Sequence, residues 1–459
     1  RRRKDFRESE VRKMDENKLL FSNRDLRKLI FPLIADQFLQ SFVGMADSVM
    51  ASSAGEAAVS GVSLVDTVMF LVINIFTAAA TGGAVVAGQY LGKGRDDMAC
   101  KAANELLTFT LKLSLLVTLL AYGGRELIID LVFGDIQPDV MYNCRVYMLF
   151  VFGSIPMIAL CNAGTAIFRA MGDSSIAMKT SLLMNGVNLG GNAILIYGFH
   201  RGVEGVAIPT LISRTLACVL VLAAFHRQDR RLHLLLPISL KTDRVLLRKI
   251  LYIGVPNGLE NSMFQLGKIL VLRVVAGFGT ASIAANAVCN SISTFCLLPG
   301  LAMGYALLTV AAQCVGAGDY GQVTYYTRKL MKAAYASLIG VNVVVLLLLP
   351  VLVGAYDLSA EARGYVFQIM IFYCLCVAVI WPFSFLIPNT LRAAADVKFT
   401  MLLSIVSMWI FRIGFCGLLG VYLNMGVLGV WAAMAVDWLF RGICFGVRYV
   451  RGKWRYKSI

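Results

Sequence analysis

The sequence has little charge, almost no histidine and none of the short motifs that mark common enzyme sites. Charged residues make up 15% of its 459 residues, whereas a soluble domain carries about 25%. The three histidines, His200, His226 and His233, fall between the long apolar stretches. No HExxH, phosphate-loop or Cys-x-x-Cys pattern occurs, so the usual metal and nucleotide sites are missing. These absences argue against a soluble domain, against a cofactor and against an enzyme. Among enzymes, the remaining alternative is one that is embedded in a membrane.

Cysteine is present but is not arranged in pairs. The eleven cysteines are spread through apolar stretches, as at Cys161, Cys218 and Cys289. Their spacing does not fit a metal site or a disulfide framework. A scattered cysteine in an apolar stretch behaves as a small packing residue. We therefore expect neither disulfides nor metal ligands among them.

Long apolar runs are what the sequence has in abundance. Hydrophobic residues make up 58% of the chain, and about 20 consecutive apolar residues span a bilayer as a helix. Only helices and closed barrels cross a membrane, and no run here alternates with the period of a strand. The sequence therefore predicts an all-α integral membrane protein with twelve transmembrane helices. They are predicted over 29–50, 63–88, 105–122, 145–168, 178–198, 203–225, 250–275, 283–313, 328–353, 364–388, 399–421 and 426–447.

The basic residues between these spans predict the orientation. Residues 1–28 hold eleven bases and no apolar stretch that would serve as a secretory signal. Loops and tails on that side of the predicted topology hold 33 Lys and Arg, and the opposite loops hold 3. Because basic loops stay in the cytoplasm, we expect both termini to be cytoplasmic, in the cell membrane of a bacterium. The basic tail is expected to touch anionic lipid and not nucleic acid.

The two halves of the chain resemble each other. A shift of 224 residues, without a gap, places Pro32 on Pro256, Gln89 on Gln313 and Gly92 on Gly316. A second block aligns at a shift of 223, with Arg169-Ala170 on Arg392-Ala393. Each half has six spans, so both begin on the same side and form a parallel repeat about a pseudo-two-fold axis along the membrane normal. We predict an N-lobe over 29–225, a basic cytoplasmic linker over 226–249, a C-lobe over 250–450 and a cytoplasmic tail over 451–459.

The first span carries an unusual polar stripe. Asp36, Gln40, Gly44 and Asp47 lie within about 80° of one another on a helix, at 100° per residue. A charged residue near the centre of a membrane helix costs about 2.5–3.5 kcal/mol on the insertion scale. Two acids on one face therefore need water, a cation or a shared proton. We interpret Asp36, Gln40 and Asp47 as a cation-coupling site, with sodium at Asp36 and Asp47 as the only metal considered.

Other polar residues inside the spans have a structural and a functional interpretation. Asn185, Asn188 and Asn192 share one face of the fifth span, either as bonds between helices or as part of a transport route. Glu260 and Lys268 in the seventh span form either an ion pair or contacts to a substrate in the cleft. At the end of the twelfth span, Asp437 and Arg441 are four residues apart, which predicts an ion pair within one helix.

The order of these motifs resembles the multidrug and toxin extrusion (MATE) family of transporters. The first span carries proline, glutamine and then the aspartate of "MADSVM", and "GEAAVSGV", "GQYLGKG" and "FRAMGDSS" follow it. The second half repeats them as "GTASIAANAV", "AQCVGAG" and "LRAAADVKFTM". The resemblance covers residues 24 to 450 and implies two lobes around a cleft that opens to each side in turn. It also implies export of organic, often cationic, compounds in exchange for protons or sodium ions, with Asp47 at the coupling site.

The sequence departs from the family pattern at the coupling residues. Asn192 stands where several proton-coupled members have an aspartate, and Trp381 stands where a sodium-coupled branch has an acid. Glu260 lies four residues before the acid of that branch. Neither set is complete, so proton and sodium coupling both stay open.

Among related functions, a flippase for lipid-linked saccharides is the alternative. Such flippases have a cationic cleft, which Lys268 and Arg273 would suit. The acidic stripe of the first span favours a small, positively charged organic cargo instead. The resemblance suggests that the protein acts as a monomer.

Labelling of introduced cysteines tests the predicted topology. Sites near Ser53, Asp135 and Asn424 should react with a membrane-impermeant thiol reagent added to intact cells, because they lie opposite the basic loops. A site near Arg231 should not react. A variant without the eleven native cysteines supplies the background, and external labelling at Arg231 would overturn the orientation.

Overall fold

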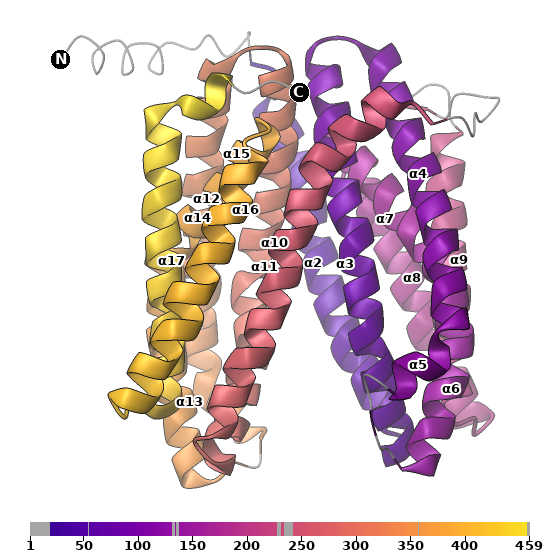
Figure 1. Ribbon diagram of the computed structural model, residues 1–459, viewed down its shortest axis with the longest axis vertical. Coiled ribbons are helices and arrows are strands. Elements are labelled where there is room, and N and C mark those ends of the chain that lie inside the picture. The colour runs from indigo at the N-terminus through magenta and orange to yellow at the C-terminus, as the bar shows by residue number, and fades with distance from the viewer. Residues whose placement is uncertain are drawn as a thin grey trace. The chain divides into compact units, whose positions relative to one another are not determined.

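The computed structural model describes residues 19–53, 55–130, 134, 137–226, 231–233, 242–356 and 358–456. These residues fold into two compact units. The N-terminal unit is Phe31–Gly258, and the C-terminal unit is Leu259–Ile459 together with the described residues before Phe31. Figure 1 shows that the long helices of each unit run side by side in a bundle. Every regular element in the described part of the chain is helical.

The elements of the first half, in chain order, are α2 (Asn23–Ser52), α3 (Glu56–Gly92), α4 (Asp96–Gly123), α5 (Arg125–Ile128), α6 (Pro138–Gly153), α7 (Ile155–Ala170), α8 (Ser175–Ala193), the π-helix η3 (Ile194–Gly198) and α9 (Glu204–Phe225). Those of the second half are α10 (Arg244–Ala276), α11 (Thr280–Gly316), α12 (Tyr320–Gly354), α13 (Ala360–Val379), α14 (Trp381–Phe385), α15 (Ile387–Ala393), α16 (Val397–Ser407), the π-helices η4 (Met408–Gly414) and η5 (Cys416–Tyr422), α17 (Gly426–Arg451) and the short η6 (Lys453–Tyr456).

Each of the twelve predicted spans falls on one helix or on consecutive helices of this list. Among the described residues, nine helices are long and apolar enough to cross a membrane, or ten if α6 and α7, bent by 45°, form one span. The two remaining spans are α8 with η3 and α10. They carry the asparagine triad and the charged pair Glu260 and Lys268, which lower their apolar content. The predicted all-helical, multi-span membrane fold is confirmed.

Prolines mark the breaks in the spans. Pro156 lies in the first turn of α7, directly after the break at Ser154. Pro382 and Pro388 likewise lie in the first turns of α14 and α15, which continue the span that α13 begins. Proline lacks the amide hydrogen that would continue the preceding helix.

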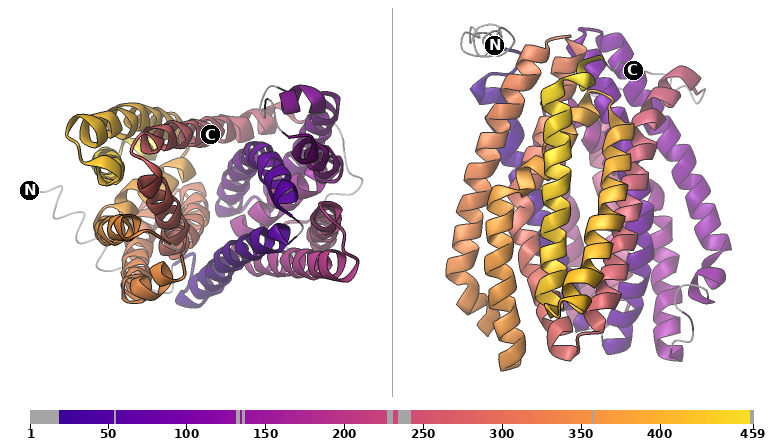
Figure 2. Two further views of the ribbon diagram at one scale, coloured as in Figure 1. Left: turned by 90° about the horizontal axis from the view of Figure 1, so that it is seen from below. Right: turned by 60° about the vertical axis from the view of Figure 1, so that its left-hand side comes forward.

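Figure 2 (right) brings α17 to the front, beside the η5 segment against which it packs.

The core of the N-terminal unit surrounds α3. This helix packs against α4, α6 and α7 through a cluster that includes Val65, Phe76, Phe152 and Ile155, all almost fully buried. On another side α3 meets α10 so closely that no side chain fits between the backbones. A Cβ atom on Gly82 would lie 2.3 Å from the carbonyl oxygen of Ile250.

The segment that leads into α2 is anchored on α12. Tyr326 donates its hydroxyl hydrogen to the carbonyl of Phe21 at 2.7 Å, and the amide of Phe21 donates to the same hydroxyl oxygen at 2.9 Å. Lys329 donates to the side chain of Asn23 at 2.5 Å. The described residues before Phe31, which include the first turns of α2, therefore belong to the C-terminal unit, whereas the rest of α2 belongs to the N-terminal unit.

The segment that leads into α10 is anchored in the equivalent way on α4. Glu105 accepts a hydrogen bond from the amide of Asp243 at 2.8 Å. Lys249 donates to the hydroxyl of Tyr90 at 3.0 Å. Glu105 and Lys329 are 224 residues apart (from 105 to 329), so the repeat places the two anchors at matching positions. Both halves are thus anchored at matching positions, through an acid in the first half and a base in the second.

The contact between α3 and α10 gives a stability prediction. Gly82→Val should destabilise the protein by about 1–3 kcal/mol, because the new side chain meets backbone atoms that have nowhere to move. Gly190→Ala in α8 is the matched control, since a Cβ atom there has open space within 4 Å. The thermal unfolding midpoint in detergent should fall for Gly82→Val and not for Gly190→Ala. Equal midpoints would show that the two helices are not closely packed.

Candidate functional site

The polar stripe of the first span lies on one continuous helix, α2. Asp36 is buried, with 2% of its surface exposed. Gln40 donates from Nε2 to Oδ1 of Asp36 at 3.1 Å, while a Cβ atom on Gly44 would meet nothing within 4 Å. Asp47 belongs to α2 by its backbone, and its side chain lies outside the described residues. The structure thus places Asp36 and Gln40 together and leaves the contacts of Asp47 as a prediction.

The asparagine triad is buried on one face of α8. Asn188 donates to the hydroxyl of Thr210 on α9 at 3.1 Å. Asn192 donates to Oδ1 of Asn188 at 3.4 Å. These bonds match the structural interpretation, in which polar side chains join membrane helices. Asn185 differs, because its buried Nδ2 has no hydrogen-bond partner in the described part of the chain.

Glu260 is the centre of a charged network in the C-terminal unit. Nη2 of Arg392 lies 2.7 Å from its Oε2, and Nη2 of Arg441 lies 3.6 Å from its Oε1. Glu260 is 4% exposed, and an acid this deep in a protein needs partners of opposite charge. The expected ion pair between Glu260 and Lys268 does not form. Eight residues separate them along α10, about 12 Å at 1.5 Å per residue, whereas arginines from α15 and α17 reach Glu260 directly.

The expected pair of Asp437 and Arg441 within α17 is also corrected. Asp437 is fully buried. Its Oδ2 lies 3.9 Å from Nη1 of Arg412, and its Oδ1 accepts a hydrogen bond from Ser407. Arg441 pairs instead with Glu260. Both side chains point from α17 into the bundle, so each meets a different helix before it meets its neighbour one turn away.

Arg392 is a site residue that the sequence did not reveal. The count of bases assigned it to a cytoplasmic loop, but it lies in α15 with 14% of its side chain exposed. The repeat carried the signal, because Arg392-Ala393 aligns with Arg169-Ala170. An arginine that occurs at the same position of both repeats is better explained by a structural role than by a place in a loop. The number of bases counted on the predicted cytoplasmic side falls only from 33 to 32, against 3 on the opposite side.

Aromatic rings cover the arginines of this network. The guanidinium carbon of Arg441 lies 5.3 Å from the ring centre of Phe264 and 4.9 Å from that of Phe385. Arg412 lies 5.2 Å from the centre of the same Phe264 ring. Cation–π contacts of this kind contribute about 0.5–2 kcal/mol each. These contacts lower the cost of placing three guanidinium groups beside only two acids, Glu260 and Asp437.

A cavity of about 240 Å³ opens beside the network, within the C-terminal unit. Its lining has two bases and no acid. The residues are Lys268, Val271, Leu272, Asn286, Asn290, Arg412, Val430, Trp431 and Met434. Lys268 thus lines a cavity, as it must if it contacts a substrate. Asn286, Asn290 and Trp431 line the same cavity, and no sequence pattern predicted this.

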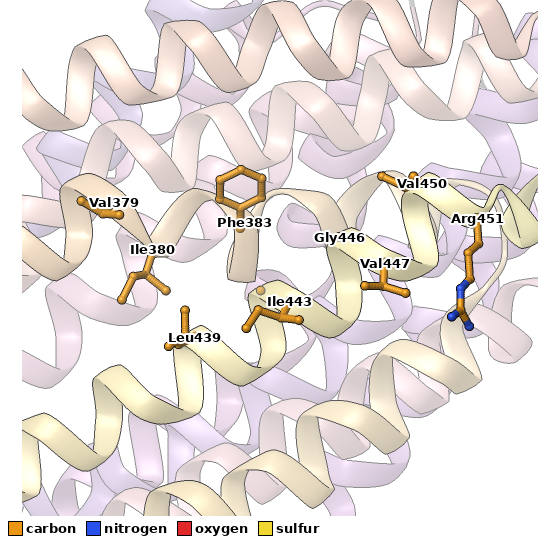
Figure 3. A pocket seen from close by; sticks show the side chains of 10 residues that line it. Val379, Ile380, Phe383, Leu439, Ile443, Gly446, Val447, Val450 and Arg451 are labelled. Carbon is orange, nitrogen blue, oxygen red and sulfur yellow. The ribbon is translucent and has the colours of Figure 1, made fainter. Parts of the chain in front are cut away.

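A larger groove of about 580 Å³ lies between α17 and the α13–α14 segment (Figure 3). Its lining is apolar except for Arg451 at one end. The residues Val379, Ile443 and Val450 of its wall are 65%, 57% and 60% exposed. Apart from Arg451, this groove offers no polar group to orient a solute, and its exposed aliphatic wall suits contact with lipid.

Metal binding is not supported by any cluster of ligands in the described ranges. No group of three His, Cys, Asp or Glu side chains there could hold a metal ion. Asp36 has Gln40 as its described neighbour, so a sodium ion at this place would need the side chain of Asp47 or ligands from outside the described residues.

Comparison with known proteins identifies the fold and its repeat. The family model MatE matches the chain twice, over residues 32–194 and 256–418. The matches begin 224 residues apart, which confirms the predicted repeat. The chain is 27% identical over 455 residues to the probable multidrug resistance protein YoeA of Bacillus subtilis, covering 95% of each chain. It is 25% identical over 446 residues to the uncharacterized transporter YisQ of the same organism, again covering 95% of each.

A solved structure shows the same fold. It is described as a transporter of the MOP superfamily from Pyrococcus furiosus with reverse polarity of its binding pocket, which suggests a different function for that protein. Its TM-score with this chain is 0.87 at 19% sequence identity, covering 95% of this chain and 96% of that one.

The ion network of the C-terminal unit gives a second stability prediction. Glu260→Gln should lower stability by about 3–5 kcal/mol, because it leaves two buried arginines without their acid. Glu361→Gln in α13 is the control, since this acid is exposed and, among the described residues, is bonded to Tyr365 alone, on its own helix. Thermal unfolding in detergent measures both. If the two variants unfold together, the network is not what stabilises the unit.

Proposed function

Because the chain belongs to the MATE family, a family of multi-pass membrane transporters and not of enzymes, we propose that it exports small organic compounds in exchange for protons or sodium ions. Asp36, Gln40 and Asp47 on α2 bind the coupling ion. Relatives such as YoeA are named as probable multidrug resistance proteins, which supports a drug-like or metabolite cargo.

The observation that carries this proposal is the burial of Asp36. The carboxyl group is 2% exposed and has the amide of Gln40 as a hydrogen-bond donor. An ionised carboxylate out of water is costly unless it is paired. Unlike Glu260, Asp36 has no arginine or lysine in an ion pair with it among the described residues. A proton or a sodium ion is the natural charge to neutralise it.

Coupling requires that the ion favour one state of the transporter. An ion that binds two conformations equally shifts nothing, and a change from one dominant state to the other needs about 5.5 kcal/mol of difference. A buried acid meets this condition when one conformation exposes it to water and the other does not. Gly44, between Asp36 and Asp47, is the proposed flexing point of α2, because glycine has no side chain that restricts the backbone.

Protons fit the charged groups better than sodium ions. Trp381 occupies the position of an acid in the sodium-coupled branch, and it is buried in a stack with Phe385 at 4.9 Å. Glu260 is held between two guanidinium groups, so it has little capacity left for a metal ion. The C-terminal unit therefore lacks the acids that sodium coupling would use there.

The orientation and assembly of the transporter are part of the same proposal. The basic tails and linker support cytoplasmic termini in a bacterial cell membrane, where the relatives occur. We take the monomer as the working unit. A flippase for lipid-linked saccharides is the second candidate, and the excess of bases over acids around Glu260 and Asp437 in the C-terminal unit is the observation that favours it.

Exchange of one acid tests the coupling site. Asp36→Asn should abolish gradient-driven export in proteoliposomes while cargo binding persists, because asparagine mimics a permanently protonated acid. Asp47→Asn should do the same. Asp139→Asn, an exposed acid at the start of α6, is the control and should export normally.

Imposing one ion gradient at a time identifies the coupling ion. Export should follow a proton gradient with sodium equal on both sides. Export driven by sodium at a clamped pH would keep the site and reverse the ion. Undiminished export by both α2 variants would refute the coupling mechanism.

A further inference from the structure

The charged groups in the wall of the cavity beside the network of the C-terminal unit are both hydrogen-bond donors. Lys268 and Arg412 line it, and neither has an acceptor function. Within the described part of the chain the exposed Lys268 has no hydrogen-bond or ion-pair partner. The Nε group of Arg412 is buried without a hydrogen-bond partner. Two cationic groups in one small cavity therefore keep unused donors.

Asn286 adds a third donor to the wall. Its Oδ1 accepts a hydrogen bond from the indole nitrogen of Trp431 at 3.1 Å. Because an indole N–H only donates, this bond fixes the amide so that the oxygen faces Trp431. The NH₂ group of Asn286 is then the end left for a ligand. Asn290 is tied down as well, since its Nδ2 donates to the backbone carbonyl of Asn286 at 2.8 Å.

Among the described residues, the acids close to the cavity balance only part of its positive charge. Asp437 is the nearest ion-pair partner, at 3.9 Å from Arg412, and one of its oxygens already accepts from Ser407. Glu260 is shared by Arg392 and Arg441. The four bases of this region thus face two acids, which leaves two positive charges in surplus. Lys268 is the one of the four with no ion-pair partner among the described residues. The electrostatic complement of such a cavity is a negative charge.

The remaining walls are apolar and set the size of the ligand. Val271, Leu272, Val430 and Met434 complete the lining with one face of Trp431. A volume of about 240 Å³ is smaller than the ~300–1,000 Å³ of pockets that enclose a drug-sized ligand. The cavity therefore fits one end of a molecule, with an acidic group against the donors and carbon against the walls.

We propose that this cavity binds the carboxylate, sulfonate or phosphate group of an amphipathic organic anion, and that the exported cargo is anionic or zwitterionic. The proposal rests on the proposed export function and replaces the positively charged cargo that the acidic stripe of α2 suggested. In this arrangement the two units divide the charges: the acids of α2 bind the coupling cation, and the bases of the C-terminal unit bind the cargo. Lys268 is the residue that decides the sign of the cargo.

Binding of three matched dyes to the purified protein in nanodiscs of zwitterionic lipid tests the proposal. Dansylglycine, dansylamide and dansylcadaverine share one fluorophore and differ in charge, being anionic, neutral and cationic. Dansylglycine should bind with the highest affinity. Lys268→Gln should weaken its binding about 10- to 100-fold, the effect of one charge-assisted hydrogen bond, and leave dansylamide unchanged. Lys268→Arg should restore most of the affinity. Lys332→Gln, an exposed base on α12, is the control and should behave as the unaltered protein does.

Arg412 is left unchanged in this experiment, because its loss would leave Asp437 without an ion-pair partner and endanger folding. Tighter binding of dansylcadaverine, or equal binding of dansylglycine by Lys268→Gln, would overturn the proposal. Phosphatidylglycerol in the nanodiscs separates a lipid headgroup from a cargo. Loss of dansylglycine binding in that lipid would assign the site to lipid, against the proposal, and retained binding supports a cargo.

The design separates this inference from the proposed function. The binding measurement needs no ion gradient, and Asp36→Asn should still bind dansylglycine. Gradient-driven export of dansylcadaverine with no binding of dansylglycine would refute the anionic cargo and keep the exporter. Lys268-dependent binding of dansylglycine without any gradient-driven export would keep the anion site and refute the exporter.

Discussion

A charged side chain inside a membrane protein needs a partner, and Glu260 supplies one for two arginines at once. Removing an ion from water costs several kcal/mol even after the protein relaxes, so the positions of the buried charges constrain the helices that carry them. Arg392 and Arg441 approach Glu260 from α15 and α17. Asp437 then links α17 to Arg412 on η4. Four separate segments of the C-terminal unit are joined through two acids, and the packing of that unit depends on these contacts.

The same constraint acts on different charges in the two repeats, although they share a fold. The repeat preserves prolines, glycines and the anchors at Glu105 and Lys329, which set the paths of the helices. The repeat does not preserve the polar side chains inside the two bundles. The N-terminal unit has a buried acid at Asp36 and an asparagine triad, whereas the C-terminal unit has a surplus of bases. A duplicated bundle can thus keep its scaffold and specialise each copy for charge of one sign.

Sequence patterns predicted the scaffold because hydrophobic length and proline breaks are local properties. All twelve predicted spans fall on helices. Proline was a weaker guide, because Pro156, Pro382 and Pro388 lie where helices break while Pro256 and Pro299 lie inside α10 and α11. The buried ion pairs were not predictable in the same way. Spacing told which residues share a face, as for Asp437 and Arg441, but not which neighbouring helix that face meets. Arg392 was misassigned to a loop because a base next to the predicted end of a span looks the same whether it points into water or into the bundle. The polar stripe of α2 was foreseen, since two acids and a glutamine on one helical face are visible without any tertiary contact.

The opposite charges of the two units have a consequence for the energetics of exchange. Moving one elementary charge across the membrane is worth about 2.3 kcal/mol per 100 mV. If one proton enters while a monovalent organic cation leaves, no net charge moves, and the membrane potential contributes nothing. If the cargo is a monovalent anion, the entry of a proton and the exit of the anion both carry positive charge inward. The exchange then moves two charges down a potential that is negative inside, which adds about 4.6 kcal/mol per 100 mV to the driving force. A transporter that holds its coupling cation on Asp36 and its cargo near Lys268 would therefore use the electrical potential twice in each cycle, and a separate sodium site in the C-terminal unit would be unnecessary.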